Sequence, residues 1–217
     1  MKTNLLFLAL VATTFASCTS LDRSRNTGDP DVSGQTLALQ VCSACHGFNG
    51  NSTSPNFPRL AGQQPDYLVA QLKDFRGHKR SDPAGFEYMW GLSRKLTDGQ
   101  IEQLSDYYSR QQSLPGAPAA EVLMHRGQSI FEQGIPDAGV PACQGCHGPA
   151  GRGNGTFPQI ARQHSDYVVK QLEVFQRTDE RPNGAMMKVV AHALTGEDMT
   201  AVAAYLQSMP EAEKPQP

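Results

Sequence analysis

The chain has 217 residues, which is enough for one large domain or two small ones. Hydrophobic residues make up 39% of the sequence, a low share for a well-filled protein core. The formal net charge of −2 is nearly neutral and gives no support to nucleic-acid binding, which needs a strongly basic surface.

Residues 1–18 are predicted to be an export signal, with a positive start, a short apolar run and small residues before its end. The apolar run is too short for a typical membrane span. The segment 15–18, Phe-Ala-Ser-Cys, resembles a bacterial lipoprotein signal, which would make Cys18 the lipidated first residue of the mature chain. The alternative is ordinary cleavage near Ala16 or Ser17, with Cys18 an incidental thiol.

Residues 42–46 read Cys-Ser-Ala-Cys-His, the C-x-x-C-H pattern of covalent c-type haem attachment. Cys42 and Cys45 are one helical turn apart, so both can reach the vinyl groups of one porphyrin. His46 then follows in position to bind the iron as its proximal ligand. The pattern recurs over residues 143–147, with the corresponding residues Cys143, Cys146 and His147.

Two such matches predict two covalently bound haems. A thioredoxin-like cysteine pair or a zinc site would each leave the adjacent histidines without a role. Covalent haem is attached outside the bacterial cytoplasm, which agrees with the predicted export signal. A porphyrin would also supply apolar surface that the side chains lack. The two motifs use four of the five cysteines, so no pair is left for a structural disulfide.

An internal duplication decides the domain organisation. Cys42 and Cys143 are 101 positions apart, and later segments repeat at offsets of 100 to 98. The matching pairs include 57–61 with 157–161, Gln63 with Gln163, 66–69 with 166–169, Gln71-Leu72 with Gln171-Leu172, and Leu96-Thr97 with Leu194-Thr195. The predicted division is a tether over 19–30, a first domain over 31–112, a linker over 113–119, a second domain over 120–210 and a disordered tail over 211–217.

Both units are predicted to be all-α, because apolar residues recur at helical spacing and no strand pattern is present. In the first unit, helices are expected over 34–45, 65–77 and 98–111, with a Gly/Pro/Asn-rich loop over 47–62. Thr97 is expected to cap the last helix. The second unit is expected to repeat this arrangement, with Thr195 capping a helix that ends near Ser208.

The second axial ligand of each iron is predicted from the repeat. Met89 lies eight residues before Thr97, and Met187 lies eight residues before Thr195. Methionine at this position favours electron transfer over ligand binding or catalysis. Met186 is the alternative ligand in the second unit. Any of these methionines could instead simply fill space in the hydrophobic core. The remaining methionines are interpreted as packing residues or have no equivalent: Met124, Met199 and Met209.

The other histidines are rivals for these distal sites. They do not match one another across the repeat, and we interpret most of them as surface or loop residues: His78, His125, His164 and His192. For two further features the sequence allows more than one location. The basic residues Arg76, His78, Lys79 and Arg80 are expected on a solvated loop, with docking of an acidic partner or contact with a haem propionate as alternatives. Tyr67 and Tyr167 are expected in a core, near a haem edge or where the units meet.

Over about residues 30–210, the chain resembles the di-haem cytochrome c4 family. The resemblance rests on the two C-x-x-C-H-G motifs, on residues 56–63, on Pro141-Ala142-Cys143 and on the equal Met-to-Thr spacing in both halves. It implies two class I cytochrome c domains related by a pseudo-twofold axis, with His/Met ligation at both irons. It also implies that the carbonyls of Pro58 and Pro158 accept a hydrogen bond from the axial histidines, although these prolines could instead only shape their loops.

Two departures from the family are visible. Arg162 replaces the equivalent of Gly62, so this loop is expected to differ in the second unit. A lipid anchor, as predicted at Cys18, is not general in the family.

The resemblance implies a periplasmic electron carrier, here tethered to a membrane by Cys18. The implied donor is a quinol-oxidising complex or a dehydrogenase, and the implied acceptor is a terminal oxidase. A first alternative is an electron-accepting subunit of a periplasmic dehydrogenase complex. A second is an enzyme, either a di-haem peroxidase or a thiosulfate-oxidising protein. Two matched methionines disfavour a peroxidase, which needs an open coordination site, and no spare cysteine serves as a distal ligand for the thiosulfate enzyme.

Overall fold

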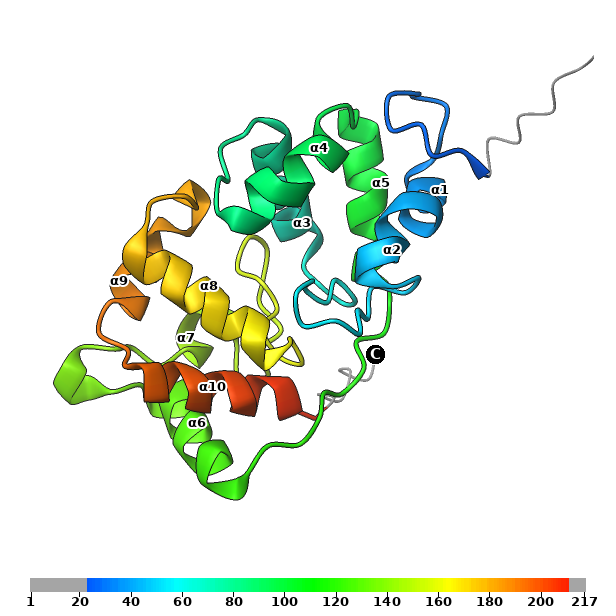
Figure 1. Cartoon of the computed structure of the whole chain (residues 1–217). Helices are drawn as coiled ribbons and strands as arrows, with labels where there is room; N and C mark the ends of the chain where they lie inside the picture. The colour runs from blue at the N-terminus through cyan, green and yellow to red at the C-terminus, as the bar shows by residue number, and fades with distance from the viewer. Residues whose placement is uncertain (1–22, 211–217) are drawn as a thin grey trace, which may run out of the picture.

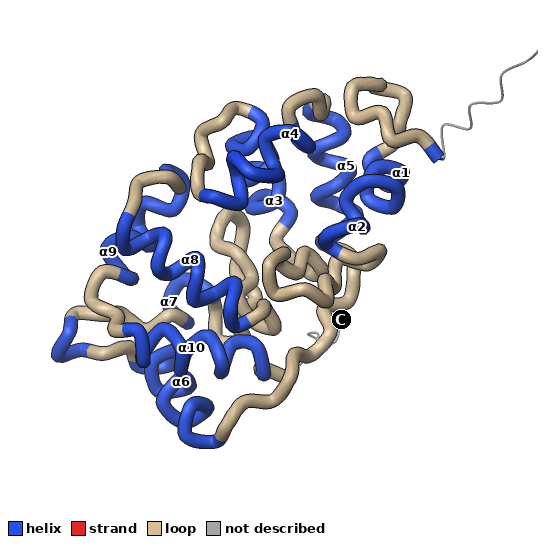
Figure 2. The backbone as a smooth tube through the Cα atoms, viewed as in Figure 1, coloured by secondary structure: helices blue, strands red, loops and turns tan. Residues whose placement is uncertain are grey.

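The computed structural model describes residues 23–210, and the expected all-α fold is confirmed within them (Figures 1 and 2). Their extended pairing is limited to two isolated β-bridges in the second domain. The export signal, Cys18, the start of the tether and the tail 211–217 lie outside the described residues. No helix within residues 23–210 is both long and apolar enough to cross a membrane.

The first domain begins with a continuous helical segment that leads directly into the first haem motif. Its helices are α1 (Gly34–Leu37), the π-helix η2 (Ala38–Cys42), α2 (Ser43–His46), α3 (Pro65–Arg76), the π-helix η3 (Gly85–Met89), α4 (Trp90–Ser93) and α5 (Asp98–Ser109). The start of α5 is fixed by a capping box, in which the Thr97 side chain accepts from Gln100 N–H and the Gln100 side chain accepts from Thr97 N–H.

The second domain repeats most of this order. Its helices are α6 (Glu121–Gln133), the 3₁₀ turn η4 (Pro136–Ala138), α7 (Gln144–His147), α8 (Ser165–Arg177), the 3₁₀ turn η5 (Pro182–Gly184), α9 (Ala185–Ala191) and α10 (Gly196–Ser208). Thr195 caps α10 through a capping box with Asp198. The sequence-based prediction of both caps is therefore correct.

Each domain is held together by a close crossing of its first and last helices. Gly34 of α1 packs against the backbone of α5, and Gly127 of α6 packs against the backbone of α10. A Cβ atom at either glycine would collide with that backbone. Gly34 lies eight residues before Cys42, whereas Gly127 lies sixteen residues before Cys143.

The additional residues form a loop over 134–142, which an isolated bridge between Ile135 and Val140 closes. The expectation that the second unit repeats the first is therefore wrong at this point. Here the first helix of the second domain ends at Gln133, before the haem motif begins.

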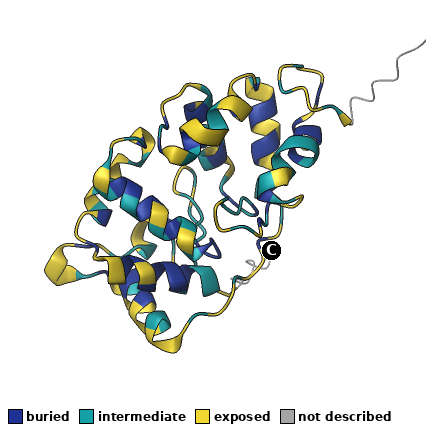
Figure 3. Ribbon diagram, in the orientation of Figure 1, coloured by how far each residue is buried: buried dark blue, intermediate teal, exposed yellow. Residues whose placement is uncertain are grey.

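The two domains have separate hydrophobic cores, which line the inner faces of the helices (Figure 3). The first core centres on Leu37, Ile101 and Leu104, and the second on Phe131, Val202 and Leu206. The segment predicted as the linker, residues 113–119, runs along one side of the molecule and is bonded to both domains (Figure 1). Leu114 N–H donates to Asn51 Oδ1 of the first domain, and Gly116 N–H donates to the carbonyl of Gln207 in α10.

Candidate haem sites and the contact between the domains

Each C-x-x-C-H motif lies at the end of a helical segment, with its two cysteines one turn apart. Cys42 ends η2 and Cys45 lies in α2, while Cys143 directly precedes α7 and Cys146 lies within it. Burial raises the pKa of Cys42 and of Cys143 to about 11. The first cysteine of each pair is partly buried and packs against the hydrophobic core of its domain, which a porphyrin would extend.

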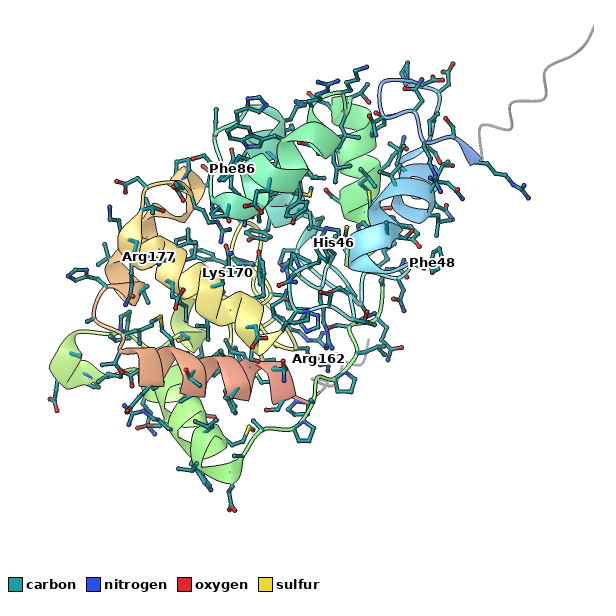
Figure 4. All side chains as sticks on the ribbon, viewed as in Figure 1. His46, Phe48, Phe86, Arg162, Lys170 and Arg177 are labelled. Atoms are coloured by element: carbon teal, nitrogen blue, oxygen red, sulfur yellow. The ribbon has the colours of Figure 1, made fainter. Side chains whose placement is uncertain are left out.

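Both motif histidines are buried and oriented by a proline carbonyl. His46 Nδ1 lies 2.9 Å from Pro58 O, and His147 Nδ1 lies 2.9 Å from Pro158 O. Burial lowers the pKa of both imidazoles more than these hydrogen bonds raise it. A neutral imidazole that donates through Nδ1 presents its Nε2 lone pair to a metal. Figure 4 shows His46 inside the first domain, whereas Phe48 projects into solvent.

The residue before each proline packs against the same histidine. Phe57 meets His46 edge-on with ring centroids 6.3 Å apart, and Phe157 meets His147 edge-on at 6.4 Å. The loop that supplies the carbonyl thus also restricts rotation of the imidazole. This arrangement is the same in both domains.

The two predicted distal methionines lie at matching places. Met89 is the last residue of η3, at its junction with α4, and it is half-buried. Met187 lies in the first turn of α9, is half-buried and packs against the second core. Met186 is 62% exposed and points away from that core. Met199 and Met209 are buried core residues, and Met124 accepts a hydrogen bond from Ser208 Oγ.

The rival histidines lie away from the two motif histidines. His78 is exposed and stacks on Trp90, His125 is exposed beside Glu121, and His192 is exposed after α9. His164 differs, because its ring is buried between the domains and its Nε2 lies 2.9 Å from Ser52 O. His164 lies in a loop, as expected for most of these histidines, but it is buried and not at the surface.

The sequence suggested that Arg80 lies on a solvated loop, and this expectation is wrong because Arg80 is buried. The residue is 4% exposed, and its guanidinium donates to Asp82 at 2.7 Å, to Gln71 at 2.7 Å and to Gln171 of the second domain at 3.2 Å. Burial raises the pKa of Asp82, but the hydrogen bond and charge of Arg80 and the charge of Arg181 outweigh it and hold that pKa below its usual value.

Arg181 is the equivalent residue in the second domain, and sequence reasoning missed it. It donates to Gln171, to Gln71 of the first domain at 3.0 Å and to the Tyr67 hydroxyl at 3.0 Å. Tyr67 therefore lies where the units meet. Arg80 and Arg181 are 101 positions apart, the offset of the haem cysteines, so the repeat itself could have identified the pair.

The loop around Arg162 keeps the conformation of its counterpart, contrary to expectation. Arg162 has φ 62° where Gly62 has φ 70°. Its backbone N–H donates to Leu206 O, as the Gly62 N–H donates to Tyr108 O. Figure 4 shows Arg162 beside the linker, and its guanidinium donates to the carbonyls of Ser113 and Met209.

Gln63 and Gln163 form a reciprocal pair across the domain contact. The Gln163 amide bonds both the N–H and the C=O of Arg59, at 2.8 and 2.9 Å. The Gln63 amide bonds both the N–H and the C=O of Gln159, at 2.6 and 2.9 Å. The duplication marks both glutamines as matching positions, but their role depends on a contact that no sequence pattern reveals.

The residues present fit a covalent haem in each domain. Each site has two cysteines on one helical turn, a buried neutral histidine with Nδ1 satisfied, and a half-buried methionine in the equivalent segment. Within residues 23–210, Arg59 Nε and Arg181 Nε are buried without a hydrogen-bond partner. Unpaired buried donors of this kind suit carboxylates such as haem propionates.

Comparisons with known proteins agree with this geometry. The cytochrome c family matches residues 32–110 and again residues 124–210. The chain is similar to cytochrome c4 of Thiocapsa roseopersicina, with 42% identity over 188 residues that cover 84% of this chain and 93% of the relative. It is also similar to the crystal structure of reduced cytochrome c4 from Pseudomonas stutzeri, with a TM-score of 0.74, 38% identity and coverage of 84% and 100%.

A further relative from Stutzerimonas stutzeri is named a thiosulfate dehydrogenase electron acceptor. It is 30% identical over 188 residues, which cover 83% of this chain and 84% of the relative.

Proposed function

Because the chain belongs to the cytochrome c4 family, we propose that this di-haem electron-transfer protein works in the periplasm, anchored through Cys18, and passes electrons to a terminal oxidase. Two covalent haems follow from the two cytochrome c domains. Their irons supply one-electron exchange between Fe(II) and Fe(III). The protein supplies the ligands, a dry pocket and a fixed relation between the domains.

We further propose the residues that hold each haem. Cys42 and Cys45 bind the first porphyrin covalently, with His46 and Met89 as iron ligands. The corresponding set in the second domain is Cys143, Cys146, His147 and Met187. The observation that carries this assignment is the duplicated hydrogen bond from each histidine to a proline carbonyl, which leaves both Nε2 atoms available.

The ligand set predicts electron transfer, because an iron with two protein ligands keeps its coordination through the redox cycle. Methionine as the second ligand raises the potential of the iron. We expect the oxidised protein to show the weak long-wavelength band of a Met–Fe(III) bond. Met89→Ala should remove the contribution of the first haem, whereas Met186→Ala, a change at an exposed methionine, should leave the band intact. A wild-type spectrum without this band, with two histidines on each iron, contradicts the assignment.

The location is tested through the export signal. We expect the wild-type protein in the membrane fraction, on the periplasmic side of the membrane. The Cys18→Ser variant should appear in the soluble periplasmic fraction with both haems attached. If Cys18→Ser remains in the membrane fraction to the same extent as the wild type, the lipid anchor is refuted.

The oxidase as acceptor is tested with isolated membranes. The reduced protein should be reoxidised by membranes that contain terminal oxidases, and an inhibitor of those oxidases should abolish the reaction. Absence of reoxidation by active membranes contradicts this acceptor.

A second candidate function is electron acceptance from a dehydrogenase. The similarity to a protein named thiosulfate dehydrogenase electron acceptor supports it. This second candidate function uses the same haem-binding residues as the first and differs from it only in the electron donor. Reduction of the oxidised protein by thiosulfate together with a thiosulfate dehydrogenase, and not by thiosulfate without that enzyme, would favour this candidate.

A further inference from the structure

One peptide group in each domain is bonded on both of its sides. The peptide that joins Pro58 to Arg59 accepts from His46 Nδ1 through its carbonyl, 2.9 Å away. The N–H of the same peptide donates to Gln163 Oε1 of the second domain at 2.8 Å. His46 is therefore connected to the opposite domain by two hydrogen bonds that share one peptide.

The second domain has the same chain of bonds in the reverse direction. His147 Nδ1 lies 2.9 Å from Pro158 O, and the N–H of the following residue, Gln159, donates to Gln63 Oε1 at 2.6 Å. Each domain thus contributes one glutamine to the peptide that orients the histidine of the other.

Both glutamines are held firmly in place by their own domains. Gln63 is 6% exposed and Gln163 is 7% exposed. Each Oε1 also accepts from the next backbone N–H of its own domain, Gln64 at 2.9 Å and His164 at 3.1 Å. Gln63 Nε2 donates to Gln159 O, and Gln163 Nε2 donates to Arg59 O. These bonds fix the orientation of each side-chain amide.

We propose that Gln163 and Gln63 are positioning residues that tune the haem of the opposite domain through this shared peptide. The inference rests on the proposed ligand roles of His46 and His147. An acceptor at the N–H of a peptide polarises its carbonyl and makes it a stronger acceptor. A stronger bond from Nδ1 makes the imidazole a more electron-rich ligand, which favours Fe(III) and lowers the potential.

Loss of either glutamine amide should raise the potential of one haem. Without the Gln163 amide, the Pro58 carbonyl is a weaker acceptor, so the potential of the first haem rises. Without the Gln63 amide, the potential of the second haem rises. The change acts on the domain that does not contain the substitution, whereas a packing defect confined to the substituted domain would act on the haem of that domain.

The test uses the full-length protein with both haems attached, in the variants Gln163→Leu and Gln63→Leu. The two potentials are measured by redox titration, with each haem followed separately by NMR. We expect Gln163→Leu to raise only the first potential and Gln63→Leu to raise only the second. Each shift should be less than tenfold in the Fe(II):Fe(III) ratio, which is below about 59 mV for one electron.

A second readout reports the hydrogen bond itself. In the reduced protein, the proton signal of His46 Nδ1–H should move towards weaker hydrogen bonding in Gln163→Leu and remain unchanged in Gln63→Leu. If Gln163→Leu does not retain both haems, Gln163→Met replaces it, because methionine has a similar length and no hydrogen-bonding amide.

Gln64→Leu is the matched control. Gln64 is the neighbour of Gln63 and also bonds across the domain contact, to Arg152 O at 2.8 Å, but it does not touch either shared peptide. It should leave both potentials unchanged. Equal shifts in all three variants would mean that only loosening of the contact matters, and unchanged potentials and proton signals in both glutamine variants would equally overturn the proposal.

These outcomes are distinct from failure of the proposed ligands. If the wild-type spectrum shows no His/Met iron, the ligand assignment fails first. If that spectrum is present and the variants show no crossed effect, only the coupling between the domains fails.

Discussion

Arg162 has the left-handed backbone conformation that Gly62 has at the equivalent position, with φ values of 62° and 70°. Glycine adopts this conformation without steric cost, whereas a residue with a Cβ pays for it. The guanidinium of Arg162 offsets this cost, because it donates to Ser113 O in the linker and to Met209 O after α10. The second domain thus uses a strained position to attach the linker.

Arg162→Ala is predicted to lower the free energy of unfolding by about 2 kcal/mol, because buried hydrogen bonds to a charged group are lost while the strained backbone remains. Arg162→Gly loses the same bonds but relieves the strain, so it should be about 1 kcal/mol more stable than the alanine variant. Denaturant unfolding of the two variants measures this difference. Equal stability of the two would show that the left-handed conformation costs nothing here.

Asp82→Asn is predicted to destabilise the contact between the domains by about 3 kcal/mol. The reason is that Arg80 and Arg181 would remain buried without the carboxylate that faces them. Denaturant unfolding gives the change in free energy. The control is Asp106→Asn, which breaks a pair with Arg110 in which both side chains are more than half exposed. That variant should change stability by no more than about 0.5 kcal/mol.

The stability of the domain contact is predicted to depend on the protonation of His164. Burial and the charge of Arg59 lower its pKa below the ordinary value of 6.5, despite the opposing effects of Ser52 O and Asp166. A histidine with a lowered folded pKa contributes stability above pH 6.5, and this is lost as the pH falls towards the folded pKa.

Unfolding measured above and below pH 6.5 tests this expectation. His164→Gln keeps a donor for Ser52 O but cannot be protonated, so its stability should fall less over the same range. An identical pH dependence in both proteins would assign the effect to another group.

Met187→Ala is predicted to remove the Met–Fe(III) band of the second haem and to lower its potential, because methionine ligation raises it. Met186→Ala is the matched control from the neighbouring position and should change neither property. Met187 packs against the second core, whereas Met186 is 62% exposed. If Met186→Ala removes the band instead, the order of the two methionines is reversed.

The features that depend on local spacing could be predicted from the amino-acid sequence. The two C-x-x-C-H motifs specified cysteines on one helical turn beside a histidine, and Thr97 and Thr195 specified the starts of α5 and α10. Because the motif and the caps involve residues within one or two turns, backbone geometry alone fixes them. The internal repeat then paired Met89 with Met187 as equivalent positions and indicated two domains.

The polar contacts between the two domains could not be predicted in this way and became visible in the folded protein. From the sequence, Arg80 is predicted on a basic loop and His164 is an unmatched histidine, but both are buried where the two domains meet. Arg80 bonds Gln171 of the second domain, and His164 bonds Ser52 of the first. Arg162 predicted a different loop, but carbonyls from the linker and from the end of the second domain hold the same conformation. The bonds from Gln63 and Gln163 join residues about a hundred positions apart. Contacts of this kind depend on how two folded surfaces fit together, and no local pattern encodes that fit.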